Sequence, residues 1–191
     1  KFVPLKLESA HTVCSHCSVG CNLDMNKKGG SLVRAVPVAE SKVDNGLLCV
    51  KGRFGFSTLQ KDRITKPMVR KEGKLVEVTW EEAVRTAVKK LQSVSSLHGS
   101  DSIAVTVSDR YTNEEIFLAS LLTKKGIKTD KAYSMNGVKS GIKEVLGYDA
   151  STNTLEELLS TETILLVGSD IMKDYTIAGL KIREAVKNGA K

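Results

Sequence analysis

The stretch that decides the fold reads VCSHCSVGCNL at residues 13–23, and a second stretch, LLCVKGRFGF, follows at residues 47–56. Together they hold all the cysteines of the chain: Cys14, Cys17, Cys21 and Cys49. The spacing is C-x2-C-x3-C, then 27 residues, then the fourth cysteine. Three thiolates this close together can line one tight loop, and a fourth from elsewhere in the chain can complete a site of four sulfur ligands.

Four thiolates suit either a [4Fe–4S] cluster or a structural zinc ion. Zinc modules usually present two separate pairs of ligands, whereas here three ligands are bunched and one stands alone. This pattern favours a cluster, with a structural zinc domain and disulfides or free thiols as the alternatives. A disulfide between Cys14 and Cys17 is disfavoured because the two residues are too close in sequence to bridge comfortably.

Composition limits the classes of protein that remain. The chain has 191 residues, of which 41% are hydrophobic, so it can build a real core. The net charge is +7, but aromatic residues make up only 5% and acids lie between the Lys and Arg residues, which argues against nucleic-acid binding. No apolar run approaches the roughly 18 residues that span a bilayer, and the N-terminus lacks a signal-peptide core. We therefore expect no membrane insertion and a cytoplasmic location, including the cytoplasmic side of a membrane complex.

The first part of the chain is rich in Gly, Pro, Lys and short β-like runs. Such runs lie at 32–39 and 47–50, and residues 67–80 form a hairpin pattern with Glu72-Gly73 at the turn. We expect residues 1–75 to be a small β-rich iron–sulfur module.

Helices and strands alternate from about residue 76 onward, which predicts a parallel α/β sheet. Capping boxes at Thr79, Thr112 and Thr154 begin three helices, and a last helix runs from Thr176 toward Gly189. The remaining elements are strands at 102–108, 127–134 and 163–169 and a helix at 137–146. We expect residues 76–191 to be the start of a larger α/β domain, because a further strand is expected after the last helix.

These motifs resemble those of the molybdopterin oxidoreductases, a family that includes the formate dehydrogenase alpha subunit and the large iron–sulfur subunit of NADH-quinone oxidoreductase. The cysteine pattern with C-x-K-G-R-F-G at 49–55 carries the resemblance most specifically, and KDRITKPMVRKEGKLVEVTWEEAV at 61–84 and ILLVGSDIMKDYTIAGLKIREAVKNGAK at 164–191 extend it. The resemblance implies that the four cysteines hold a [4Fe–4S] cluster. It also implies that Lys51 lies between the cluster and a pterin, on an electron path. Gly52 and Gly55 are expected to allow close backbone approach near the cluster.

One departure from the family pattern concerns the metal ligand of the pterin site. Active members supply a Cys, selenocysteine, Ser or Asp near the region that aligns with residues 132–138, and this chain has no cysteine there. Ser134 is a weaker candidate for an oxygen ligand. Asn136 stands where the formate dehydrogenase group has a histidine. The resemblance therefore favours an electron-relay region like that of the NADH-quinone oxidoreductase subunit, in a complex with other redox subunits. The alternative is an N-terminal fragment of a formate dehydrogenase that binds Mo or W through bis-molybdopterin guanine dinucleotide.

Overall fold

The computed structural model describes residues 6–135, 141–148 and 150–191. The chain divides into two compact units, one formed by Lys1–Lys61 with Lys139–Lys191 and the other by Asp62–Val138. The architecture is mixed α/β, with a small antiparallel sheet near the N-terminus and an α/β segment after it. This confirms the predicted fold class.

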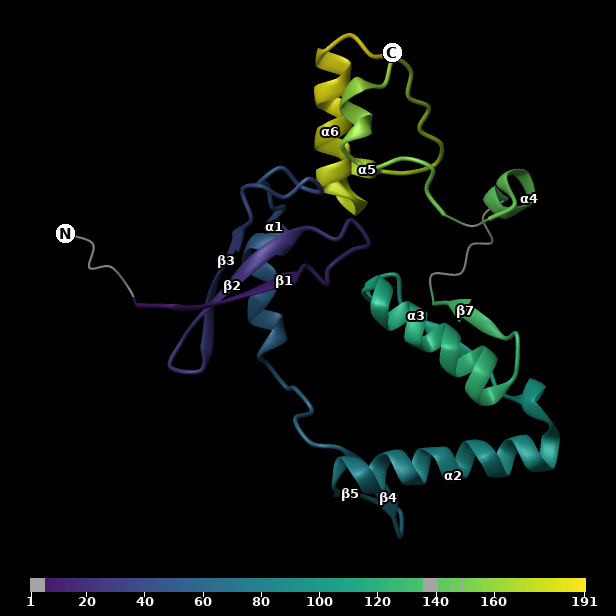
Figure 1. Ribbon diagram of the computed structural model, residues 1–191. Coiled ribbons are helices and arrows are strands. Elements are labelled where there is room, and N and C mark those ends of the chain that lie inside the picture. Colours follow the sequence, from purple (N-terminus) through teal and green to yellow (C-terminus); the bar gives the residue numbers. More distant parts are fainter. Residues whose placement is uncertain (1–5, 136–140, 149) are drawn as a thin grey trace. The chain divides into compact units, whose positions relative to one another are not determined.

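The first unit begins with a three-stranded antiparallel sheet (Figure 1). Its strands are β1 (Glu8–Val13), β2 (Asn22–Lys28) and β3 (Ser31–Pro37), paired in the order β1-β2-β3. Val13 lies opposite Asn22, so the residues between them form the connection from β1 to β2. Leu23 of β2 and Ala35 of β3 are buried and give the sheet its apolar face.

Short helices complete the first unit. They are α1 (Val50–Phe54), the 3-10 helices η1 (Gly55–Leu59) and η4 (Glu157–Ser160), and α4 (Ile142–Leu146), α5 (Ile171–Asp174) and α6 (Thr176–Lys187). Helices α5 and α6 lie side by side (Figure 1). Helix α6 buries Ile177, Ala178, Lys181 and Ala185, which recur at helical spacing along one face. Ile177 packs in a core cluster with Cys14, Cys21 and Leu23.

The second unit opens with the predicted hairpin, which is confirmed. Strands β4 (Met68–Lys71) and β5 (Lys74–Glu77) pair across Glu72 and Gly73, both with positive φ, as a tight hairpin turn requires. Helix α2 (Trp80–His98) follows, and the Thr79 hydroxyl accepts a hydrogen bond from the Glu82 backbone N–H at its start. The 3-10 helix η2 (Ser100–Ser102) comes after it.

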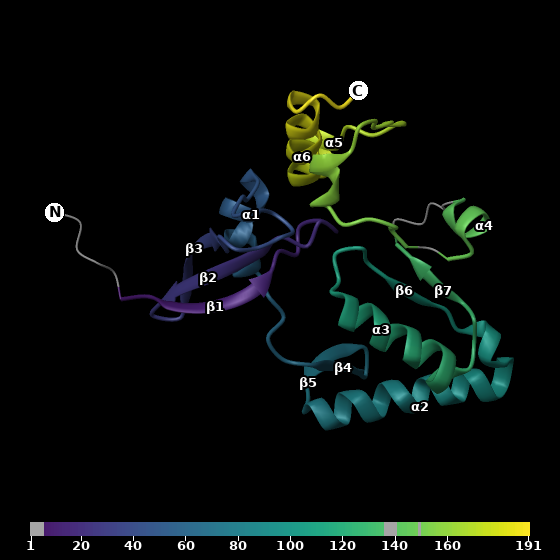
Figure 2. The ribbon, with the colours of Figure 1, turned by 45° about the horizontal axis from the view of Figure 1, so that its top comes forward.

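A parallel strand pair forms the rest of the second unit (Figure 2). Strand β6 (Val105–Val107) pairs with β7 (Ala132–Ser134), and the chain between them forms α3 (Asn113–Leu121) and the π-helix η3 (Leu122–Ile127). A complete capping box between Thr112 and Glu115 starts α3, as the sequence predicts. The parallel pairing agrees with the predicted helix–strand alternation.

Three predicted elements differ from the structure. Residues 163–167 form no strand, although TILLV has high β propensity. Ile164 and Glu162 instead exchange backbone hydrogen bonds with Lys191 alone, and no strand lies alongside this segment in the described chain. Residues 47–50 are also not a strand, because Cys49 caps α1. The helix predicted at Thr154 is only the 3-10 turn η4, while residues 137–140 of another predicted helix lie outside the described residues.

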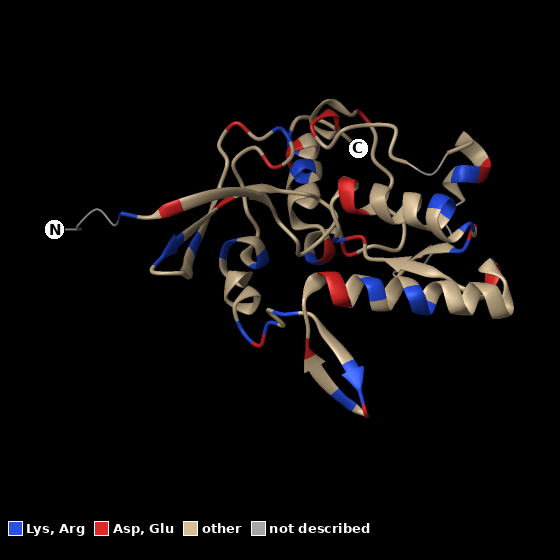
Figure 3. Cartoon of the chain, turned by 60° about the horizontal axis from the view of Figure 1, so that its bottom comes forward, with Lys and Arg blue, Asp and Glu red and all other residues tan. Residues whose placement is uncertain are grey.

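Basic and acidic residues are interspersed within each unit rather than gathered by sign (Figure 3). No helix among the described residues is both long enough and apolar enough to cross a membrane.

Candidate iron–sulfur site

Three of the four cysteines lie in the connection between β1 and β2. Cys14 follows the last residue of β1, and Cys21 precedes the first residue of β2. The backbone N–H of Cys14 donates to the carbonyl of Cys21 at 2.8 Å, which closes the loop at its base. Gly20, with φ of 74°, supplies the left-handed turn before Cys21 that a side chain would disfavour. The sheet therefore fixes the two ends of the loop, and Cys17 lies within it.

The fourth cysteine begins helix α1. Cys49 is the residue that caps this helix, and its Sγ accepts a hydrogen bond from the backbone N–H of Gly52 at 3.4 Å. Gly52 is buried, and a Cβ placed on it would lie 3.6 Å from the Sγ of Cys14. That separation is an ordinary van der Waals contact, so α1 packs directly against the three-cysteine loop at this residue. Arg53 holds the helix to the sheet, because its guanidinium donates to the carbonyl of Ala35 at 3.2 Å.

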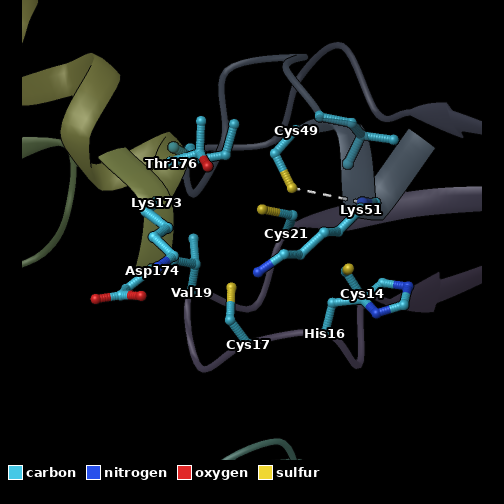
Figure 4. A pocket seen from close by; sticks show the side chains of 13 residues that line it. Cys14, His16, Cys17, Val19, Cys21, Cys49, Lys51, Lys173, Asp174 and Thr176 are labelled. Atoms are coloured by element: carbon cyan, nitrogen blue, oxygen red, sulfur yellow. Dashed lines mark hydrogen bonds between the residues drawn. The ribbon is translucent and has the colours of Figure 1, made fainter. Parts of the chain in front are cut away.

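The four thiols line one pocket, and none of them forms a disulfide. Figure 4 shows their sulfur atoms around a shared space, with the side chain of Lys51 reaching toward them from α1. The opposite wall of the pocket consists of residues of α5 and α6, namely Lys173, Asp174, Thr176 and Ile177. The structure therefore brings together five of the residues predicted from sequence. Among the described residues, no three His, Cys, Asp or Glu side chains are close enough to hold a single metal ion.

Burial and nearby charge act on the thiols. Burial raises the pKa of Cys21 to about 12, and the negative charge of Asp44 contributes to that rise. Burial also raises the pKa of Cys14, against a hydrogen bond from the His16 backbone that lowers it. Both thiols are thus poor thiolates unless a positive ion or group compensates their charge, and metal binding requires the deprotonated form.

The residues present fit a [4Fe–4S] cluster. The donor set is four reduced sulfur atoms on one pocket, and the loop and the capped helix that carry them are tied to the same sheet. Lys51 adds a cation to the pocket wall, as suits an anionic iron–thiolate group.

Other predicted residues lie elsewhere. Ser134 ends β7 in the second unit, whereas the four cysteines belong to the first. Asn136 lies outside the described residues.

Two further residues belong to the surroundings of the cysteines. His16 lines the pocket, and its ring lies so close to the backbone that a Cβ on Gly55 would collide with Nε2. Asp44 is fully buried in the loop that leads to Cys49. One signal in the sequence could have indicated a buried charge next to the site. The charged residue Lys181 interrupts the apolar face of α6 between Ile177 and Ala185.

Two family models match the chain in succession. The Fe4S4 domain of molybdopterin oxidoreductases matches residues 7–61, and the molybdopterin oxidoreductase domain matches residues 63–191. The chain belongs to the molybdopterin oxidoreductase family. The Fe4S4 match covers all four cysteines, so it supports a [4Fe–4S] cluster over a zinc ion.

Individual proteins with similar sequences support this family assignment. A putative formate dehydrogenase of Bacillus subtilis is 28% identical over 188 residues, which are 95% of this chain and 19% of that protein. The F420-dependent formate dehydrogenase 2 subunit alpha of Methanococcus maripaludis is 29% identical over 187 residues, 95% of this chain and 27% of that subunit. The chain thus spans about a fifth to a quarter of the length of these oxidoreductase relatives.

A solved structure shows the same fold. Acetylene hydratase from Pelobacter acetylenicus superposes with a TM-score of 0.67 over 95% of this chain and 26% of its own, at 15% identity.

Proposed function

We propose that this chain is the electron-transfer region of a molybdopterin oxidoreductase, with Cys14, Cys17, Cys21 and Cys49 as ligands of its [4Fe–4S] cluster. The observation that carries the proposal is the convergence of these four free thiols on one pocket. When bound, the cluster supplies a one-electron carrier. Residues 1–75 would form the cluster module, and residues 76–191 the start of the pterin-type domain.

The residues around the thiols have separate roles in this proposal. Lys51 places a positive charge against the site, which favours the reduced and more negative form of the bound group and provides a route toward a pterin. The Gly52 backbone N–H bonds to Cys49 and stabilises negative charge on that sulfur. Burial of Cys14 and Cys21 excludes water from one side of the site.

The test uses the full-length protein, prepared without oxygen. We expect about four iron and four sulfide per chain for this site, together with an EPR signal that appears on reduction. A colourless protein that holds a single zinc ion and no sulfide would contradict the proposal. Because other clusters can occur in a whole protein, a Cys17→Ser variant should lose this site's share of iron while a Ser18→Ala variant keeps it.

The family offers two settings for such a region. The first is a relay subunit like the large iron–sulfur subunit of NADH-quinone oxidoreductase, favoured by the absence of cysteine from residues 132–138. The second is a formate dehydrogenase alpha subunit, favoured by the names of the similar proteins from Bacillus and Methanococcus. In the second setting the whole protein would bind Mo or W through bis-molybdopterin guanine dinucleotide, with Ser134 as a metal ligand.

Metal and pterin content decide between the two settings. A catalytic subunit would contain Mo or W and pterin, would oxidise formate, and would lose that activity in a Ser134→Ala variant. A relay subunit would contain iron and sulfide without pterin. Under both settings we expect other redox subunits as partners, which activity measurements on purified complexes would test. We also expect a cytoplasmic location, which cell fractionation would test.

A further inference from the structure

Asp44 is an unusual residue in the first unit. It has 0% exposure, and neither of its carboxylate oxygens has a hydrogen-bond partner in the structure. A buried charge without a partner opposes folding, so such groups are paired or serve a function. An Asp in a turn normally accepts a bond from a nearby backbone N–H, whereas here only the main-chain carbonyl of Asp44 does so, from Leu47 at 2.9 Å. The carboxylate is therefore not explained by the turn.

The loop around Asp44 is firmly held. The backbone N–H of Asn45 donates to the carbonyl of Ser41, and the amide of Asn22 donates to the hydroxyl of Ser41 at 3.1 Å. Asn45 and Gly46 adopt positive φ and turn the chain toward Cys49. Asp44 is thus fixed in the segment that delivers the fourth cysteine.

A second buried charge lies on the same loop. Lys181 of α6 is 4% exposed, and its ammonium binds the side-chain oxygen of Asn45, the residue next to Asp44. Within the described part of the chain, Asp44 and Lys181 are the charged residues that are buried. Ile177 lies one helical turn before Lys181 and lines the cysteine pocket. A buried acid and a buried base therefore lie on the two segments that adjoin the site, the loop before Cys49 and helix α6, whereas Lys51 lines the pocket itself.

We propose that Asp44 tunes the electron affinity of the site: its buried negative charge lowers the reduction potential of the group held by the four cysteines, and Lys181 partly offsets it. This inference rests on the proposed function. Reduction adds one electron to an anionic group, and no bond forms or breaks. A fixed negative charge nearby opposes that step, and a low-dielectric interior strengthens its effect. Asp44 is held near the ligands by the chain, because it lies on the loop that leads to Cys49 and its main-chain carbonyl accepts from the backbone N–H of Leu47.

The test measures the reduction potential of this cluster in the full-length protein, by EPR-monitored titration with dithionite and redox mediators. Asp44→Asn keeps the shape of the side chain and removes its charge. We expect the equilibrium constant for one-electron reduction to rise about tenfold, which corresponds to about 59 mV. Glu40→Gln is the matched control, because Glu40 lies on the same loop but is exposed, and we expect no shift. The Asp44→Asn shift should persist at high ionic strength, because buried charges are little screened.

Lys181→Gln provides the opposite arm, with an expected fall in potential. If Asp44→Asn fails to assemble the cluster, the direction of the Lys181→Gln shift decides: a fall supports the proposal and an unchanged or higher potential overturns it. Equal potentials for wild type, Asp44→Asn and Glu40→Gln also overturn it. Iron and sulfide analysis of the wild type separates these outcomes from failure of the proposed function, which would show as no cluster at all.

Discussion

The two units of the chain use their apolar residues differently. In the first unit, Cys14, Cys21, Leu23 and Ile177 form one buried cluster directly behind the pocket. In the second unit, helix α2 buries none of its residues, and Trp80 and Phe117 are 73% and 61% exposed. The difference teaches that the thiols are positioned by local packing and short loops, whereas long and regular helices carry little of the site. Changes to the first unit should therefore affect the site far more than equivalent changes to the second.

The largest effect is expected from the ligands themselves. Cys21→Ser or Cys49→Ser should remove nearly all of this site's cluster signal, because a four-sulfur site that loses one ligand is incomplete. Phe117→Ala in the second unit should leave the cluster content unchanged. Iron content and the EPR amplitude of the full-length variants provide the measurement, and equal losses for both kinds of variant would contradict the comparison.

The next effect concerns the core behind the pocket. Ile177 is 2% exposed, so Ile177→Ala should lower the free energy of unfolding by about 2–5 kcal/mol. Leu118→Ala, at a side chain that is 62% exposed in α3, should change it by less than about 0.5 kcal/mol. Urea denaturation of the two variants compares them. A larger cost at Leu118 would mean that the second unit contains the more tightly packed core.

A smaller effect is expected where His16 meets α1. Gly55 has φ of −70°, which alanine adopts freely, so the penalty of Gly55→Ala arises from the collision with the His16 ring. We expect a loss of about 1–3 kcal/mol, as in other overpacked sites. In a His16→Ala background the same substitution should cost almost nothing. A full cost in both backgrounds would show that the ring contact is not the cause.

The last effect, which is small just above pH 9 and grows as the pH rises, is a pH dependence of the cluster-free protein. The thiol of Cys21 has its pKa raised from 9.0 to about 12 in the folded state. Above pH 9 the unfolded chain therefore loses a proton that the folded chain retains, so stability that is complete below pH 9 falls between about pH 9 and 12. Cys21→Ala should flatten this part of the stability curve, measured by urea denaturation at several pH values. An unchanged slope would exclude Cys21 as its origin.

The sequence predicted the elements that local chemistry determines. Turn and capping signals at Glu72-Gly73 and Thr112 gave the hairpin and helix α3 correctly. The strand predicted at 163–169 was wrong because a strand depends on a neighbour to pair with, and the described chain provides only Lys191. Residues 47–50 were misread because three apolar residues resemble a strand, while the Cys49 thiol acts as a helix cap.

The site was predicted in part for a similar reason. Spacing in the sequence identified the four cysteines, and the family resemblance added Lys51. The contribution of α6 is a contact across more than a hundred residues, as the bond between Lys181 and Asn45 shows. No local pattern encodes such a contact. Asp44 was missed because an aspartate in a loop is normally exposed, and nothing in the neighbouring sequence indicates that this one is buried.

The most direct test of the central claim is the location of iron. Crystals of the full-length protein, grown without oxygen, would be measured on both sides of the iron absorption edge. We predict an anomalous peak for a four-iron group bonded to the Sγ atoms of Cys14, Cys17, Cys21 and Cys49. A peak at the zinc edge in its place, or iron bound away from these sulfur atoms, would contradict the account.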